Sequence, residues 1–117
     1  MVPVMVHAPA VDAAFHALSN PTRRKVLERL SAGPATVSEL AAPFDMQLPS
    51  FVQHLAVLER SRLVRSTKRG RVRTYEVVPE RIAAAEDWLS ARRRAWEARL
   101  DRFDDYVKQL KEKESGS

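Results

Sequence analysis

Two short stripes of apolar residues at helical spacing open the chain and predict two helices. The stripes consist of Val11, Phe15 and Leu18, followed by Val26, Leu27 and Leu30. Asn20 can cap the free amides of the second helix, and Pro21 fits its first position, where a missing N–H costs nothing. Gly33 and Pro34 predict the end of that helix.

A capping pattern and a proline predict two further helices separated by a tight turn. The Thr36 hydroxyl can accept a hydrogen bond from the Glu39 amide, while the Glu39 carboxylate accepts one from the Thr36 amide. Pro43 stops the first of these helices, and residues 44–46 form the turn. The second helix is predicted over about Leu48–Arg60.

Alternating residues after this helix predict a β-hairpin. Its strands are Leu63–Lys68 and Val72–Val77, where β-branched and aromatic residues alternate with polar ones. Gly70, between Arg69 and Arg71, can adopt the positive φ that a tight tip needs. The predicted fold class is therefore mainly α with a β-hairpin wing, a winged helix-turn-helix.

A long helix is predicted to follow the hairpin. It begins at Pro79 and carries apolar residues every seven positions, as far as about Gln109. The repeat consists of Ile82, Leu89, Trp96, Phe103 and Leu110, with Leu100 and Val107 in a second row. Residues 111–117 are predicted to be frayed.

The apolar repeat of the long helix has two possible partners. A helix of about 30 residues is roughly 45 Å long, which exceeds a small winged domain, so part of the repeat is expected to lack a partner in its own chain. We therefore expect a homodimer, with the alternative that the helix packs back on its own domain. The predicted dimer interface consists of Phe15, Ile82, Leu89, Trp96, Leu100, Phe103 and Val107.

The helix predicted over Leu48–Arg60 buries one face and leaves the other free. At 100° per residue, Phe51, Leu55 and Leu58 share the buried side. The first residues of the second motif helix contact base edges in helix-turn-helix proteins. The predicted DNA contacts of this helix are Gln47, Leu48, Pro49, Ser50, Val52, Gln53 and His54.

Three of these residues have a more specific expectation. Gln53 can pair with adenine through two hydrogen bonds, and Val52 can pack on a thymine methyl group. His54 lies about 60° from the centre of the buried face. We expect it to be half-buried and bonded to the backbone, with a direct DNA contact as the alternative.

The positive charge of the chain is concentrated in its first two thirds. The 117 residues include 20 Lys/Arg and 15 Asp/Glu, a net charge of +5. Residues 1–78 hold eleven basic and six acidic residues, hence +5, whereas residues 79–117 hold nine of each. Like charges on a hairpin repel one another unless an anion is near, so the hairpin is predicted to face a polyanion. An ordinary solvated charged surface is the alternative. Its predicted contacts are Lys68, Arg69, Arg71 and Arg73.

Missing residue types exclude several functions. The chain has no cysteine, which excludes disulfides, thiol catalysis and thiolate metal sites. No apolar run approaches the ~20 residues of a membrane span, and the first eleven residues lack the basic start of a secretory signal. The three glycines of the chain form no phosphate-binding loop motif. The three histidines have no serine and aspartate at the spacing of a catalytic triad. We expect no catalytic residue, no cofactor and no metal.

Three segments resemble ArsR-type (arsenic-repressor-like) winged-helix regulators. Phe15–Arg24 is similar to the opening of that family, and Gln53–Leu58 to its recognition helix. Leu63–Arg65, Gly70 and Tyr75 are similar to its wing. The resemblance implies a cytoplasmic homodimer that represses transcription by binding a palindromic operator.

The resemblance also suggests a domain organisation. Residues 12–78 would be the DNA-binding core and residues 79–110 the long dimerisation helix, in a single domain of residues 1–117. A helical protein-interaction module built on the long helix is the competing class of function. Salt dependence separates the two, because phosphate contacts weaken steeply with salt.

The metal chemistry of the family does not carry over. Metal-sensing members carry cysteines on the first motif helix, where this chain has Thr36 and Ser38, and no Asp–His pair stands within residues 82–109. The effector is therefore left open. Asp45 replaces a glycine common at the motif turn and tolerates the left-handed conformation. Gln47 replaces the usual serine cap, and a glutamine is a weaker cap.

Overall fold

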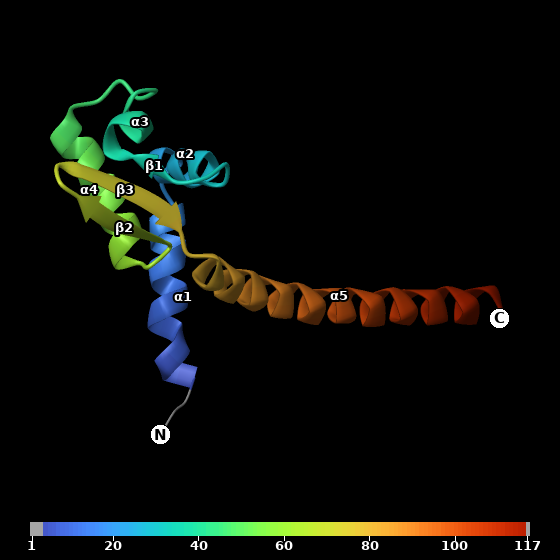
Figure 1. Cartoon of the computed structure of the whole chain (residues 1–117). Coiled ribbons are helices and arrows are strands. Elements are labelled where there is room, and N and C mark those ends of the chain that lie inside the picture. Colours follow the sequence, from blue (N-terminus) through green and yellow to red (C-terminus); the bar gives the residue numbers. More distant parts are fainter. Residues whose placement is uncertain (1–3, 117) are drawn as a thin grey trace. The chain divides into compact units, whose positions relative to one another are not determined.

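The computed structural model describes residues 4–116. Its elements are α1 (Val4–Leu18), α2 (Pro21–Leu30), β1 (Ala35–Thr36), α3 (Val37–Ala41), α4 (Leu48–Arg60), β2 (Val64–Arg69), β3 (Val72–Val77) and α5 (Pro79–Ser115) (Figure 1). The chain divides into two compact units, residues 1–85 and residues 86–117, with the division inside α5.

Helix α1 is longer than the sequence predicts, and a different face of it is buried. It begins at Val4 and not at Val11. Within residues 10–18, Ala14 and Ala17 are the buried residues, Phe15 is only half-buried, and Leu18 is partly buried against the core. Alanine is small and weakly apolar, so the sequence pattern gave more weight to the larger side chains beside it.

Helix α2 begins as predicted. The Asn20 Oδ1 atom accepts a hydrogen bond from the Arg23 amide at 3.1 Å, and Pro21 is the first helical residue. The predicted apolar stripe of α2 is buried, and Arg23 is buried with it. Gly33 follows the helix with φ of 139°, a conformation that favours glycine.

The two motif helices α3 and α4 are also confirmed. The capping box of α3 is complete, since the Thr36 amide donates to Glu39 Oε1 at 2.9 Å and the Glu39 amide donates to Thr36 Oγ1 at 3.2 Å. The hydrogen bond from the Thr36 amide is the main reason that the pKa of Glu39 lies below its ordinary value. Helix α4 has the predicted bounds and buries Phe51, Leu55 and Leu58.

The left-handed backbone near the motif lies at a different residue from the one expected. Asp45 is not among the residues with positive φ, whereas Arg62 has φ of 64°. The Arg62 amide donates to the Glu59 carbonyl at 3.0 Å, and the Leu63 amide donates to the Leu58 carbonyl at 3.2 Å. These bonds close the last turn of α4 and direct the chain into β2.

The predicted hairpin belongs to a three-stranded antiparallel sheet in the order β1-β3-β2. Strand β2 covers Val64–Arg69, one residue later than expected, and leaves Gly70 and Arg71 as the turn. Strand β1 was missed by the sequence analysis. Its two residues are too few to show alternation, and Thr36 also serves as the N-cap of α3. Ala35 of β1 lies opposite Tyr75 of β3.

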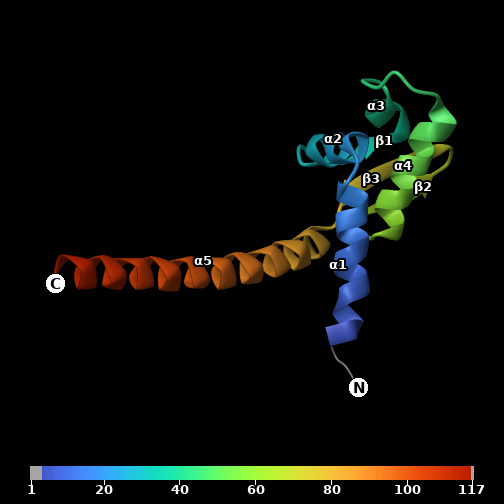
Figure 2. The same ribbon diagram turned by 180° about the vertical axis from the view of Figure 1, so that it is seen from behind.

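One apolar core holds the first unit together. Figure 2 shows α4 and the sheet next to each other from behind, and α4 contributes three of the most deeply buried side chains. Residues from every other element of this unit complete the core, namely Ala14, Ala17, Val26, Leu27, Leu30, Ala35, Leu40, Leu63, Val64, Tyr75 and Ala85. The Phe44 ring packs on Phe51 at 5.3 Å between centroids, which attaches the motif turn to this core.

The second unit is the remainder of α5. This helix continues to Ser115, so residues 111–115, which the sequence predicts to be frayed, are helical; Ser117 lies outside the described residues. No helix within residues 4–116 combines the length and apolar character of a membrane span. The predicted fold class, mainly α with a β-hairpin wing and a long last helix, is confirmed.

The capping box yields a stability prediction. Thr36→Ala removes the side-chain oxygen that accepts from the Glu39 amide, so it should lower the free energy of unfolding by about 1 kcal/mol. Urea unfolding followed by circular dichroism measures this change. Thr36→Ser keeps the oxygen and is the matched control. Equal stability of the alanine and serine variants would show that the cap contributes nothing.

Candidate nucleic-acid interface

The N-terminal half of α4 presents an exposed face with both polar and apolar groups. Leu48 and Val52 are 55% and 42% exposed, which is unusual for apolar side chains at the start of a packed helix. The predicted contacts that are exposed are Gln47, Leu48, Pro49, Ser50, Val52 and Gln53. This face can offer apolar contacts and amide hydrogen bonds at the same place.

The first turn of α4 has no side-chain cap. Gln47 occupies the N-cap position, and its side chain makes no capping hydrogen bond. The free amides and the positive end of the helix dipole therefore favour an anion at this end. The Gln47 side chain also stays available for other contacts.

The wing distributes its cations over both faces of the hairpin. Lys68 lies directly opposite Arg73 in the β2–β3 register, so their side chains share one face. Arg69 lies opposite Val72, and their side chains share the other face. A directly opposed pair of like charges destabilises a hairpin, and a bound polyanion relieves that repulsion.

Two arginines of the wing are held by contacts within the chain. Arg65 Nε lies 2.7 Å from Glu76 Oε1. Arg73 Nη1 donates to Ser66 Oγ at 2.8 Å, and Ser66 Oγ donates to Glu59 Oε2 at 2.8 Å. Because Glu59 belongs to α4, this chain of bonds fixes the wing to α4. The sequence analysis did not single out Ser66 or Glu59, since neither is part of a motif.

The cations nearer the tip are left without acidic partners. Among the described residues, Lys68, Arg69 and Arg71 form no ion pair. Burial raises the pKa of Tyr75, whose hydroxyl also lies near the Glu59 carboxylate, so this tyrosine is a neutral member of the core. The wing therefore has two arginines held by contacts within the chain and a tip with uncompensated positive charge.

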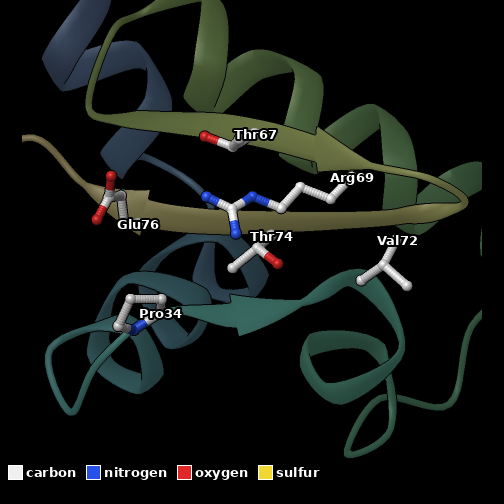
Figure 3. A pocket seen from close by; sticks show the side chains of 6 residues that line it. All are labelled: Pro34, Thr67, Arg69, Val72, Thr74 and Glu76. Carbon is white, nitrogen blue, oxygen red and sulfur yellow. The ribbon is translucent and has the colours of Figure 1, made fainter.

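A shallow hollow lies on the face of the sheet that carries Arg69. Its volume is about 380 Å³, and its lining consists of Pro34, Thr67, Arg69, Val72, Thr74 and Glu76. Figure 3 shows the Arg69 side chain lying along the strands, with its guanidinium between Thr67 and Thr74. This arginine is directed back along the wing and not beyond the tip.

The buried Arg23 supports the recognition helix from behind. It is only 8% exposed. Its Nε atom donates to the Ala17 carbonyl at 2.7 Å, and Nη2 donates to the His16 carbonyl at 3.0 Å. Its Nη1 atom lies 3.2 Å from Nδ1 of His54 on α4. One sequence signal could have indicated that Arg23 is buried. Arg23 lies three residues before Val26, which places it on the buried face of α2.

His54 differs from its expectation in one respect. It is half-buried as predicted, but its hydrogen-bond partner is the Arg23 guanidinium and not the backbone. Burial, followed by the neighbouring positive charge of Arg23, lowers the pKa of His54. The expectation failed because it weighed only backbone groups near α4, and the partner lies 31 residues away in sequence.

Comparisons with known proteins bear on this geometry. A family model described as a helix-turn-helix domain matches residues 18–67. The HTH-type transcriptional regulator Rv2034 of Mycobacterium tuberculosis is 42% identical over 73 residues, which cover 62% of this chain and 68% of that protein. The transcriptional repressor SdpR of Bacillus subtilis is 29% identical over 79 residues, which cover 68% of this chain and 88% of that protein.

Solved structures agree with these relatives. The crystal structure of an ArsR family transcriptional regulator is 52% identical with a TM-score of 0.74, covering 77% of this chain and 93% of that one. This chain belongs to the ArsR family. A homodimeric winged helix-turn-helix DNA-binding domain from Mycobacterium bovis, 22% identical, shares the fold with a TM-score of 0.64 and covers 81% of this chain and 90% of that one.

The ArsR assignment gives the chain a general function. The chain is a transcriptional regulator with a helix-turn-helix DNA-binding domain, a class that is generally not enzymatic. Among the residues that the structure describes, no group of three or more histidines and carboxylates is arranged to hold a metal ion.

The tip of the wing yields a prediction for this ArsR regulator. Lys68→Ala or Arg71→Ala should weaken binding about equally to specific and non-specific duplexes. Each change should lower the slope of log affinity against log salt by roughly one, because each removes one phosphate contact. Fluorescence anisotropy at several salt concentrations measures the slope. Arg65→Ala, which removes a cation already paired with Glu76, is the control with a smaller expected change.

The outer face of α4 yields a second prediction. Gln53→Ala should relax base preference at one position of each half-site, at a cost of about 1–3 kcal/mol for the preferred base. Selection from random duplexes with the variant and the wild type measures the preference. Arg60→Ala, at the far end of the same helix, serves as the comparison. If the Gln53→Ala profile equals that of the wild type, this side chain does not contact a base.

Proposed function

We propose that the protein is a sequence-specific repressor that binds a palindromic operator as a homodimer in the cytoplasm. The exposed start of α4 would lie in the major groove, and Lys68, Arg69, Arg71 and Arg73 would contact flanking phosphates. The observation that carries the proposal is the uncompensated charge of the wing beside an uncapped helix start. The repressor role is supported by the similarity to SdpR.

A dimer is expected because one recognition helix specifies only a short DNA sequence. One such helix contacts only a few base pairs, which are too few to select a site in a genome. A two-fold dimer presents two helices to successive major grooves about 34 Å apart. The homodimeric relative from Mycobacterium bovis supports the same assembly.

The proposed interface is the apolar stripe of α5 within residues 86–117. Trp96, Leu100 and Phe103 are 57%, 62% and 62% exposed, and Leu89 is exposed as well. Val107 is half-buried. At 100° per residue, these side chains share one side of the helix. Large exposed apolar residues on one side of a helix are typical of a protein–protein contact.

Ile82 and Phe15 have a different setting from the rest of the expected interface. Ile82 is partly buried against the core of the first unit, so part of its side chain already contacts its own chain. Phe15 is half-buried on α1, away from the most deeply buried face of that helix. In our proposal the main interface begins at Leu89, and Phe15 contributes an outer layer.

Three arginines interrupt the apolar stripe, and two of them have partners within the helix. Arg92 lies over the Trp88 ring at 5.2 Å from its centroid, and Arg93 Nε lies 3.7 Å from Glu97 Oε1. Both contacts join residues one turn apart on α5. These contacts hold the Arg92 and Arg93 side chains along the surface of the helix. The apolar stripe is then free to be buried in the dimer interface.

Selection of operators from random duplexes tests the proposed function. Purified protein should enrich a palindrome whose two half-sites are about 10 base pairs apart from centre to centre. Enrichment of a single half-site would contradict the dimer. Enrichment of no sequence, with affinity that depends little on salt, would favour the interaction module built on α5.

The stripe yields a prediction about assembly. Trp96→Ala should shift the protein toward monomer, at a cost of about 2 kcal/mol or more if Trp96 lies at the centre of the interface. Operator affinity should fall with it, because the second half-site is lost. Analytical ultracentrifugation at micromolar concentration measures the shift.

The matched control for this prediction is Trp88→Ala. Trp88 lies about 80° away from Trp96 around α5 and contacts Arg92. Its truncation removes an aromatic side chain of the same size from the same helix, so it should leave the dimer largely intact. A Trp96→Ala protein that remains dimeric and binds the operator normally would place the interface elsewhere.

A further inference from the structure

The contact between Arg23 and His54 has only one consistent arrangement of protons. A guanidinium group has five N–H donors and no acceptor. Nδ1 of His54, 3.2 Å from Arg23 Nη1, must therefore be the acceptor. A neutral imidazole that accepts at Nδ1 carries its proton on Nε2, and a protonated imidazole cannot accept at all. The contact thus selects one tautomer of the neutral ring.

The Arg23 side chain is held strongly enough to impose this choice. Its Nε and Nη2 atoms donate to the Ala17 and His16 carbonyls at the C-terminal end of α1, where the helix dipole favours a cation. The neighbouring Arg24 donates to the Leu18 carbonyl at 2.7 Å. With two of its nitrogens fixed, the guanidinium can present only Nη1 to α4.

The Nε2 atom of His54 is left to interact outside the chain. No described residue bonds this atom, and no described side-chain nitrogen or oxygen is buried without a partner. Nε2 therefore reaches solvent. His54 directly follows the exposed Gln53 and lies about 40° from Ser50 around α4. His54 therefore stands at the edge of the exposed face of α4.

We propose that Arg23 is a positioning residue that fixes His54 as the Nε2–H tautomer, which makes His54 a neutral hydrogen-bond donor to a DNA phosphate. The inference rests on the proposed DNA-binding function. It assigns His54 a role unlike that of the wing, because a neutral donor releases no counterion. Arg23 touches no DNA and acts only through the imidazole.

Nitrogen NMR of the free protein tests the tautomer without any DNA. In a sample with ¹⁵N-labelled histidine, His54 should show a protonated Nε2 and an unprotonated Nδ1. It should stay neutral as the pH falls through about 6.5, the ordinary pKa of histidine. The His54→Gln spectrum identifies the signal. A Nδ1–H tautomer, or a cationic ring at neutral pH, would overturn the proposal.

Substitution of Arg23 tests the cause of the tautomer. Arg23→Gln removes the positive charge, so the pKa of His54 should rise and the Nδ1–H tautomer should appear. If this variant folds and His54 keeps both its tautomer and its pKa, Arg23 does not position the ring. The His54 variants below keep Arg23 in place and decide the issue even if Arg23→Gln does not fold.

Two amide substitutions of His54 test the roles of its two ring nitrogens separately. In His54→Asn the amide can occupy the place of Nδ1 and accept from Arg23, but nothing replaces Nε2–H. Its affinity for DNA should fall by about threefold to tenfold, equally for operator and non-specific duplexes, with unchanged thermal stability. His54→Gln can extend its amide N–H toward the place of Nε2 and should recover most of the affinity.

The salt dependence distinguishes a neutral donor from a cation. His54→Asn should leave the salt slope unchanged, whereas a lost cation would lower it by roughly one. Wild-type affinity in the asparagine variant would refute the DNA contact, and a change of base preference would indicate a base contact in place of a phosphate contact. If the wild type binds no duplex at all, the proposed function fails, while the NMR result for the tautomer still stands or falls independently.

Discussion

The Arg23 guanidinium is the polar contact that links α4 to the two helices before it. A buried charge is costly unless hydrogen bonds and an opposing potential compensate it. Here the carbonyls of His16 and Ala17 supply both, because they form the negative end of α1. The same guanidinium contacts His54 and so joins α1, α2 and α4. Removing it would leave the buried Ala17 carbonyl and Nδ1 of His54 without their hydrogen-bond partner.

The wing uses its charges in two different ways. At the base, Glu76 and the Glu59–Ser66 pair hold Arg65 and Arg73 in place. Lys68, Arg69 and Arg71 have no acidic partner among the described residues, and Lys68 lies directly opposite Arg73 across the strands. Structural order and available positive charge are therefore separated along one hairpin. This separation suits a rigid surface that presents cations to phosphates at a fixed distance from α4.

The elements that the sequence predicted well carry strong local signals. The caps at Asn20 and Thr36 and the apolar face of α4 depend on residues three or four positions apart, which a sequence pattern displays directly. The elements that it missed depend on distant partners. Strand β1 exists because Ala35 meets Tyr75, and the hydrogen-bond partner of His54 is Arg23, 31 residues away in sequence. Neither relation is visible in the periodicity of a single segment.

The proposed site divides in the same way. The exposed residues at the start of α4 follow from helical geometry, and the basic run of the wing follows from composition. The neutralised state of Arg65 and the attachment of the wing to Glu59 do not, because both require the register of β2 and β3. Hydroxyl-radical footprinting of the protein on a selected operator tests the central claim most directly. We expect two protected patches related by two-fold symmetry about one helical turn apart, with added protection outside them from the wings. A single unsymmetric patch, or uniform protection independent of sequence, would contradict the account.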